Sequence, residues 1–331
     1  MKALVARQFG PIDAIRMEEL ADPTPKDGEV LIDVSAAAVN FPDVLVVAGQ
    51  YQVKPPLPFI PGKELAGVVR AVGAGVAKFR PGDRVIALVE YGAYCERAAV
   101  RHELCFPAPP DLPVASAAGL GVAYQTAHFA LHHRGQLRRG ETVMVTGANG
   151  SVGLAAMQLA KAAAATVVAL INDPAKREIV LANGADHALL FDQQASKDAF
   201  RHQVLEAVGT RGVDLLIDNA GGAAFDYCLR TLAWEGRAVI VGFTSGEIPS
   251  IRANYLLVKN ISAVGLQWSD YRDRAPDMVA RVHGEICRML CADLLHPRVM
   301  ATFPFVEFKD AFKLLTSRQT RGKIILMMAN A

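Results

Sequence analysis

An alternation of short apolar runs with longer amphipathic stretches, between residues 142 and 264, constrains the fold of this chain more than any other feature. Runs such as Val213–Ile217 are dominated by Val, Leu and Ile, which is typical of strands covered on both faces. The pattern predicts an α/β unit in which helices flank a doubly wound parallel sheet. The predicted strands are Thr142–Thr146, Thr166–Ile171, His187–Phe191, Val213–Asn219, Arg237–Val241 and Ile261–Val264, and the predicted helices are Ser151–Ala164, Ala175–Asn183, Lys197–Val208 and Ala223–Leu232.

A glycine-rich turn joins the first predicted strand to the first predicted helix. Gly147, Gly150 and Gly153 are spaced by three, as G-x-x-G-x-x-G. A dinucleotide site needs one glycine for the tight turn, one for close approach of the backbone to a pyrophosphate, and one for packing of helix on strand. The N–H groups at the start of the helix then face the phosphates. The spacing departs from G-x-G-x-x-G, so the alternative is a turn that serves only chain geometry, which the flanking strand and helix disfavour.

The end of the second predicted strand bears on the choice between NADH and NADPH. An NAD site places an acid there to bond the ribose 2′-hydroxyl, but this strand ends in Asn172. Asp173 precedes a proline, a combination that favours a helix cap over a ribose contact. Lys176 and Arg177 follow one turn later and are suited to pairing with a 2′-phosphate, with an ordinary solvated helix face as the alternative. The segment therefore favours NADPH.

The rest of the chain has a different character. Residues 1 to 118 contain short strand-like runs at Glu29–Ser35, Val68–Val72 and Arg84–Val89, and the four prolines of Pro55–Gly62 indicate a surface loop. Helices are predicted near residues 276–293 and 308–317, and a last strand, Lys323–Met327, is expected to rejoin the N-terminal part. The predicted domains are residues 1–121 with 264–331, and residues 122–263.

Composition excludes several classes of function. The net charge of the 331 residues is +2 with no basic block, which argues against a nucleic-acid partner. The uncharged, apolar stretch of residues 142–160 is broken by the glycine turn, so no membrane span is predicted. An early charged residue, Lys2, argues against a secretory signal, and an intracellular, cytoplasmic location is expected. The five cysteines contain no C-x-x-C pair, so they are interpreted as neutral thiols rather than zinc ligands.

Several short motifs follow one another along nearly the whole chain. They lie in the segments Val39–Val44, Gly49–Tyr51, Pro58–Val69, Lys78–Val85, Gly92–Glu96, Ala117–Ala118, Thr126–Ala127, the glycine turn, Asp218–Gly222, Val241–Thr244 and Arg321–Leu326. In this order they resemble the motifs of the medium-chain dehydrogenase/reductase superfamily, in its zinc-independent, zeta-crystallin-like quinone oxidoreductase branch. The resemblance implies a GroES-like, β-rich catalytic domain together with a Rossmann domain.

The resemblance bears on the metal question at named positions. Zinc-dependent relatives place Cys and His at the positions of Asn40 and Lys63, and Gly119–Gly121 offers no thiol for a third ligand. The segment Val85–Gly92 is also too short for a four-cysteine structural lobe. No metal is expected, Lys63 is interpreted as merely solvated, and Glu64 is expected to be structural.

The same resemblance suggests roles for individual residues. The candidate catalytic residues are Asn40, Tyr51 and Thr126, with a turn residue, a packed aromatic ring and a helix-face hydroxyl as the respective alternatives. Tyr51 is a possible proton donor, although solvent is another source of the proton. The candidate coenzyme-binding residues are Asn40, Thr126, Gly147, Asn149, Gly150, Ser151, Val152, Gly153, Asn172, Lys176, Arg177, Phe191, Asn219, Gly242, Phe243, Thr244 and Lys323.

Three functions remain open on the sequence. The first is zinc-independent hydride transfer from NADPH to a quinone or similar conjugated carbonyl, a small-molecule substrate. The second is NADPH-dependent reduction of an enone or enoyl-CoA, and the third is a catalytically silent NADPH-binding protein. The family also implies a homodimer formed through the edge strand Ile261–Val264.

Overall fold

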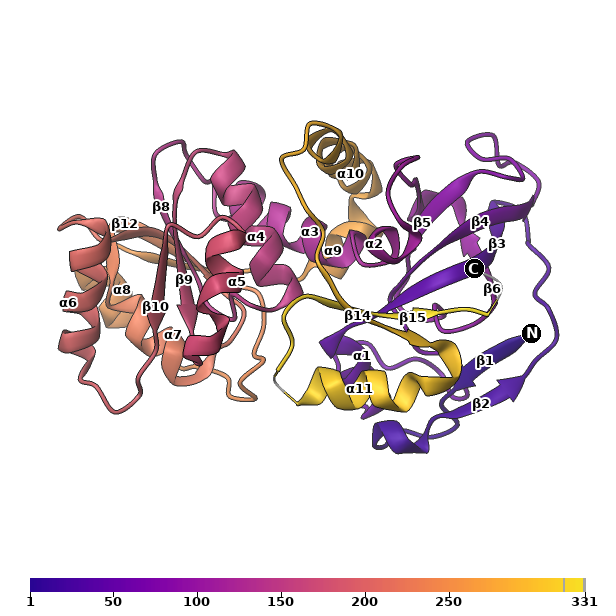
Figure 1. Ribbon diagram of the computed structural model, residues 1–331, viewed down its shortest axis with the longest axis horizontal. Coiled ribbons are helices and arrows are strands. Elements are labelled where there is room, and N and C mark those ends of the chain that lie inside the picture. The colour runs from indigo at the N-terminus through magenta and orange to yellow at the C-terminus, as the bar shows by residue number, and fades with distance from the viewer. Residues whose placement is uncertain (318, 330–331) are drawn as a thin grey trace. The chain divides into compact units, whose positions relative to one another are not determined.

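The computed structural model describes residues 1–317 and 319–329. The chain forms two compact units, and Figure 1 follows it through both. Each unit is considered by itself. The N-terminal unit comprises Met1–Val122, Ser269–Cys287 and Pro297–Ala331, and the second unit comprises Ala123–Trp268 and Arg288–His296.

The second unit is built around a six-stranded sheet in which every pair of neighbouring strands is parallel. Its strand order, β10-β9-β8-β11-β12-β13, is the 3-2-1-4-5-6 order of a Rossmann fold, so we call it the Rossmann unit. The predicted parallel sheet is confirmed. Its strands are β8 (Thr142–Val145), β9 (Thr166–Ile171), β10 (His187–Leu190), β11 (Val213–Asp218), β12 (Leu232–Ile240) and β13 (Ser262–Gly265).

The helices of the Rossmann unit follow the predicted alternation. Helix α4 packs on β8 and β9, and helix α7 packs on β11 and β12, because their apolar faces are covered by the sheet. Helices at the start of this unit and before β13 were not predicted. The helices are α3 (Gly121–His128), α4 (Ser151–Ala162), α5 (Arg177–Ala182), α6 (Lys197–Val208), α7 (Gly222–Leu229) and α8 (Ala253–Lys259).

One strand of this unit differs from its prediction for a physical reason. Strand β12 begins at Leu232, whereas the predicted strand began at Arg237. The first part of β12 was missed because a polar interruption lies inside the strand. Glu235 has a left-handed φ of 61°, Gly236 follows, and the register of β12 on β11 shifts at this point. Irregularities of this kind break the apolar run on which a strand prediction depends.

The N-terminal unit contains a seven-stranded sheet with the order β14-β15-β3-β4-β5-β7, in which β6 also pairs with β3. The last strand, Lys323–Met327, pairs with β14 on one side and with β3 on the other, so the prediction that the tail rejoins this part is confirmed. Strands β1 and β2 form a separate pair. The strands are β1 (Lys2–Val5), β2 (Arg16–Glu19), β3 (Glu29–Val39), β4 (Glu64–Val72), β5 (Arg84–Leu88), β6 (Arg97–Arg101), β7 (Cys105–Pro107), β14 (Val299–Pro304) and β15 (Lys323–Met327).

The remaining helices of the chain include two near the predicted tail helices and several that the sequence did not predict. Helices α1 and α2 have seven and five residues, too few for a visible helical period. The proline-rich segment Pro55–Gly62 forms no helix and no regular strand, as predicted. The helices are α1 (Phe41–Val47), α2 (Val114–Ala118), α9 (Trp268–Arg274), α10 (Pro276–Cys291) and α11 (Phe308–Thr316).

Apolar side chains fill a separate core in each unit. In the N-terminal unit the core gathers around Leu65, Tyr94 and Phe312, all fully buried, and in the Rossmann unit around Leu216 and Phe225. Within residues 1–317 and 319–329, no helix has both the length and the apolar character that a membrane crossing requires. Three cysteines, Cys95, Cys105 and Cys228, are buried, and burial raises the pKa of both Cys95 and Cys105 to about 12.

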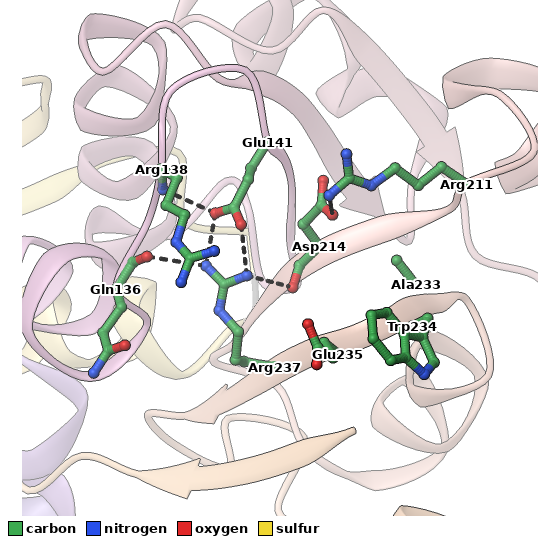
Figure 2. Close-up of a pocket in the computed structure, with 9 residues that line it drawn as sticks. All are labelled: Gln136, Arg138, Glu141, Arg211, Asp214, Ala233, Trp234, Glu235 and Arg237. Carbon is green, nitrogen blue, oxygen red and sulfur yellow. Dashed lines mark hydrogen bonds and ion pairs between the residues drawn. The ribbon is translucent and has the colours of Figure 1, made fainter. Parts of the chain in front are cut away.

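A cavity of about 470 Å³ lies at the amino ends of β8, β11 and β12, and Figure 2 shows its lining. Its polar groups largely satisfy one another. Arg237 donates to both carboxylate oxygens of Glu141, at 2.8 and 2.7 Å, and to the carbonyl oxygens of Gln136 and Asp214. Arg211 pairs with the Asp214 carboxylate at 2.8 Å. These bonds connect the amino ends of β8, β11 and β12, so we interpret the cluster as structural.

Candidate active site

The glycine turn of the Rossmann unit has the geometry that the sequence predicted. Gly147 has a left-handed φ of 57°, which favours glycine. A Cβ on Gly153 would lie 2.4 Å from the Gly147 carbonyl oxygen and 2.7 Å from the Cα of Ala148, so helix α4 packs directly on the turn. A Cβ on Gly150 would lie 3.3 Å from the same oxygen. The turn therefore forms a cradle that side chains would fill.

The start of helix α4 is suited to hold an anion. Gly150 is its N-cap and offers no side chain to cap the first N–H groups, which have no partner within a helix. The helix has twelve residues, and its first turn consists of Ser151, Val152 and Gly153 without an acidic side chain. Unpaired N–H groups and the helix dipole together favour a phosphate at this position.

A buried polar network follows strand β11 at the carboxyl edge of the sheet. Thr146 donates through Oγ1 to the Asp218 carboxylate at 2.6 Å, and its oxygen accepts from the N–H of Asn219 at 3.0 Å. Asn219 also donates through Nδ2 to the Thr146 carbonyl oxygen at 2.9 Å. Burial raises the pKa of Asp218, against the hydrogen bond that it accepts from Thr146. The network fixes the orientation of the Asn219 amide.

One atom of this network lacks a partner. The side-chain oxygen of Asn219 is buried and accepts no hydrogen bond within the described part of the chain. Asn219 lies against the glycine turn, since a Cβ on Gly147 would be 3.3 Å from its Cβ. An orphaned acceptor beside an anion-binding turn indicates a ligand that brings both a donor and a phosphate. A nicotinamide dinucleotide, with its ribose hydroxyls and pyrophosphate, fits this set of groups.

The residues after β12 border the same network. Thr244 donates from its N–H and from Oγ1 to the carbonyl oxygen of Asn219, at 3.1 and 3.0 Å. The nitrogen of Gly242 lies 3.3 Å from the Asp218 carbonyl oxygen, and Phe243 lies against Gly221, where a Cβ would be 2.9 Å from the ring. The structure thus brings together the predicted residues that follow β8, β11 and β12.

Of the predictions for the residues that follow β9, one is confirmed and one is corrected. Asp173 accepts a hydrogen bond from the N–H of Ala175 at 2.9 Å, so its predicted capping role is confirmed. Lys176 is not on a solvated face: it is 5% exposed, and its Nζ donates to Oδ1 of Asn172 at 2.8 Å. Arg177 is exposed and donates to the Ala188 carbonyl oxygen at 2.9 Å.

Two further predicted residues of this unit, Phe191 and Thr126, lie among other side chains of the unit. Phe191 lies edge-on to Tyr227 and Phe200, with ring centroids 5.2 and 6.0 Å apart. Thr126 is buried in helix α3, next to Gln125. Both amide atoms of Gln125 are buried and have no partner within the described residues, a feature that no sequence signal indicated.

In the N-terminal unit, Asn40 lies at the centre of a buried polar cluster. It caps helix α1 in a capping box with Asp43, whose carboxylate accepts from the Asn40 N–H at 2.8 Å. Its Nδ2 donates to the Ala38 carbonyl oxygen and to Glu64, both at 3.2 Å, and its Oδ1 accepts from Nζ of Lys323 at 2.6 Å. The alternative of a simple turn residue is therefore wrong, because Asn40 begins a helix and bonds a buried ion pair.

Glu64 and Lys323 form that ion pair. The Lys323 ammonium donates to Oε1 of Glu64, and the side chains of Lys323 and Glu64 are 6% and 0% exposed. The other carboxylate oxygen of Glu64 accepts from the N–H of Val122 at 2.8 Å. Both oxygens of Glu64 are thus engaged inside the unit, which agrees with its expected structural role.

Asp43 is the second carboxyl group of the cluster and was not singled out from the sequence. Its Oδ2 accepts from the Tyr94 hydroxyl at 2.5 Å, while its Oδ1 is buried without a partner among the described residues. Complete burial raises the pKa of Asp43 to about 6, although the Tyr94 bond and nearby Lys63 oppose the shift. The Asn-x-x-Asp capping pattern was the available signal for this residue.

Lys63 is the clearest correction to the sequence interpretation. It is not merely solvated: its side chain is 7% exposed, and Nζ donates to the Glu90 carboxylate at 2.5 Å and to the Glu90 carbonyl oxygen at 3.2 Å. The same Nζ lies 4.5 Å from the centre of the Tyr51 ring. Arg272 donates to the other oxygen of Glu90 at 3.0 Å. No sequence signal joins Glu90 to a partner 182 positions away.

Comparison with known proteins places this geometry in a family. Residues 26–151 match the model of the alcohol dehydrogenase GroES-like domain, and residues 151–284 match that of a zinc-binding dehydrogenase. Quinone oxidoreductase-like protein 2 of Rattus norvegicus is 37% identical over 315 residues, which cover 95% of this chain and 89% of the relative. The chain belongs to the quinone oxidoreductase branch of the medium-chain dehydrogenase/reductase superfamily.

Other members of the superfamily match over nearly their whole length. The quinone oxidoreductase of Rattus norvegicus is 33% identical, with 99% of this chain and 98% of the relative covered. The crystal structure of the quinone oxidoreductase of Thermus thermophilus, which was also solved in complex with NADPH, is 32% identical. It superimposes with a TM-score of 0.84 and covers 99% of this chain and 100% of that one. The predicted fold class, a GroES-like β-rich part and a Rossmann part, is confirmed.

Zinc does not fit the residues at the positions where zinc-dependent members of the superfamily bind it. Zinc takes thiolate, imidazole or carboxylate ligands, whereas these positions hold the amide of Asn40 and the ammonium of Lys63. The adjacent carboxylate of Glu64 is already paired with Lys323. In the described part of the chain, no group of three or more His, Cys, Asp or Glu side chains is placed to hold a metal ion.

Proposed function

We propose that this protein transfers hydride from NADPH to a quinone or a similar conjugated carbonyl without a zinc ion. The observation that carries the proposal is the orphaned Asn219 oxygen beside the glycine turn and the uncapped start of α4. These groups suit the hydroxyls and the pyrophosphate of a dinucleotide. The solved complex of the Thermus thermophilus relative with NADPH supports the same coenzyme.

The preference for NADPH over NADH rests on the end of β9. The buried Lys176 ammonium is held beside the exposed Asn172, and Arg177 follows on the exposed side. No acid is free there for a ribose 2′-hydroxyl, since Asp173 caps the next helix. We assign the 2′-phosphate to Asn172, Lys176 and Arg177. Phe191 is assigned to the adenosine end as a packing group.

We assign the remaining roles to the other candidate residues. When bound, the coenzyme would supply the hydride. The pyrophosphate would be held by Gly147, Asn149, Gly150, Ser151, Val152 and Gly153. The nicotinamide half would be held by Asn219, Gly242, Phe243 and Thr244. Thr126, Asn40 and Lys323 are assigned to orienting coenzyme and substrate. Tyr51 is assigned as proton donor to the substrate oxygen. Conjugated acceptors suit such a site because their negative charge spreads over the ring or enone, so hydrogen bonds suffice to stabilise it.

Steady-state oxidation of NADPH tests the proposal. The protein is offered a panel of quinones, enones and enoyl-CoA thioesters, with NADH in parallel and with and without a chelator. We expect quinone turnover with NADPH that the chelator does not alter. Turnover of enones or enoyl-CoA alone would replace the proposal with the enoyl reductase, and NADPH binding without any turnover would favour the silent protein. Loss of activity to the chelator would contradict the metal-independent mechanism.

We also propose a cytoplasmic homodimer formed through the edge of the Rossmann sheet. Strand β13 has a sheet neighbour on one side only, and Leu257 and Val258 of α8, just before it, are 76% and 71% exposed. An open strand edge beside exposed apolar side chains favours pairing with a second copy. Light scattering of the purified chain is expected to give twice the 35.5 kDa monomer mass. A monomeric mass would reject the dimer.

A further inference from the structure

Lys63 and Tyr51 bring a buried cation into close contact with a candidate proton donor in the N-terminal unit. The ammonium lies over the ring face, 4.5 Å from its centre. A buried cation gains more from an aromatic face than an exposed one, because little water competes for it. Two N–H bonds of Lys63 are directed to Glu90, so its third N–H is available to the ring.

Lys63 is held rigidly by its surroundings. The preceding Gly62 has a φ of 100°, and a Cβ there would lie 2.7 Å from the ring of Tyr94 and 2.9 Å from the Cβ of Ala93. The Lys63 carbonyl oxygen accepts from the N–H of Val89 at 2.8 Å. Both the main chain and the ammonium are thus fixed, so the cation cannot follow Tyr51 if the ring moves.

The acids near Lys63 also serve other groups. Glu90 also accepts from Arg272, which is 4% exposed, so one carboxylate serves two buried cations. The nearby Asp43 accepts from the Tyr94 hydroxyl and from the Asn40 N–H. The Lys63 ammonium lies over the Tyr51 ring, and a cation stabilises negative charge that develops beside it.

We propose that Lys63 is the positioning residue of Tyr51: it fixes the ring and stabilises the phenolate that forms when Tyr51 gives its proton to the reduced substrate. This rests on the proposed hydride transfer. Hydride from NADPH adds to the conjugated carbonyl and leaves a negative oxygen on the substrate. The O–H bond of Tyr51 breaks, a new O–H bond forms on that oxygen, and solvent reprotonates the phenolate. NADPH is oxidised, and the substrate gains one hydride, which carries the two electrons, and one proton.

The test compares Lys63→Met, which keeps the length of the side chain and removes the charge, with Lys63→Arg, which retains the charge. We expect kcat to fall by about 10- to 100-fold in Lys63→Met, where 100-fold is about the smallest contribution of a general acid to the rate. We expect a smaller fall in Lys63→Arg. The KM for NADPH is expected to change by less than about twofold, because the coenzyme is assigned to other residues. The alkaline limb of the pH profile of kcat is expected to move to higher pH in Lys63→Met.

Tyr51→Phe provides the matched control. In that background the proton donor is already lost, so Lys63→Met is expected to lower kcat by less than about twofold further. If Lys63→Met lowers kcat equally in both backgrounds, or leaves the alkaline limb in place, the residue is structural and the proposal is overturned. A loss of kcat in Lys63→Arg as large as in Lys63→Met overturns it as well. Absence of any turnover in the wild type contradicts the proposed function itself, and is thereby distinguished from failure of Lys63.

Discussion

The two units present polar groups by different means. In the Rossmann unit the candidate coenzyme site is made mostly of main chain, with Gly147, Gly150 and Gly153 keeping side chains out of the turn. In the N-terminal unit the candidate site is made of charged side chains buried in pairs, such as Glu64 with Lys323 and Lys63 with Glu90. A main-chain site depends on shape, whereas a charged site depends on the balance of its charges. Mutations should therefore impair the two sites in different ways.

The largest effect is expected from Lys323→Met, which leaves the fully buried Glu64 without its cation. Removing one partner of a buried pair costs about 3–5 kcal/mol, so the free energy of unfolding in urea should fall by that amount. In the double variant Glu64→Gln/Lys323→Met the uncompensated charge is gone, and we expect at least half of the loss to be restored. A loss below about 1 kcal/mol in the single variant would contradict a site held by charge balance.

The charged site of the N-terminal unit is also expected to make the stability of the protein depend on pH. The pKa of Asp43 is about 6 in the folded chain against 3.8 for an ordinary Asp, so the native chain holds a proton between pH 4 and pH 6 that the unfolded chain has released. The free energy of unfolding therefore falls by about 3 kcal/mol as pH rises through this window, and this contribution is constant above it. Asp43→Asn should remove that slope in urea titrations at several pH values. The same replacement at the exposed Asp111 should leave the slope intact.

The main-chain site is expected to respond to volume rather than to charge. Gly153→Ala places a Cβ 2.4 Å from the Gly147 oxygen and should force the turn apart. We expect NADPH affinity to fall by about 30-fold, or about 2 kcal/mol, in isothermal titration. Gly284→Ala is the matched control, since that helical glycine has open space at its Cβ position. Equal affinity in both variants would show that the turn does not hold the coenzyme.

The smallest effect is expected at Thr244. Thr244→Val keeps the shape and removes the hydroxyl that donates to the Asn219 carbonyl oxygen at 3.0 Å. The loss of one hydrogen bond is worth about 1 kcal/mol, so the KM for NADPH should rise by about fivefold. Thr316→Val, which removes a hydroxyl bonded to the Phe312 carbonyl oxygen, should leave the KM unchanged. A KM unchanged in Thr244→Val would separate Asn219 from the coenzyme site.

The sequence predicted the main-chain site of the Rossmann unit better than the charged site of the N-terminal unit. The glycine turn and the strands around it are local signals, and residues such as Gly147 and Asn219 lie at strand ends that a parallel sheet necessarily brings to one edge. The capping role of Asp173 was also local and is confirmed. The start of β12 was missed because Glu235 and Gly236 interrupt its apolar pattern.

The charged cluster could not be predicted in the same way. Lys63, Glu90 and Arg272 come from the segment before β4, the segment after β5 and helix α9, and no spacing relates them. A lysine by itself is usually solvated, which is why Lys63 was interpreted as a surface residue. Only the tertiary fold shows that its ammonium is buried against an acid. Asp43 was also missed, although its capping box with Asn40 is a four-residue pattern that the sequence displays.

The place of β15 between two strands of the N-terminal sheet makes that sheet sensitive to any truncation before residue 323. A product that stopped after residue 322 would retain the whole Rossmann unit. It would nevertheless lack the strand between β14 and β3 together with the cation that neutralises Glu64. A late stop codon or frameshift in this gene is thus expected to act as a loss-of-folding allele.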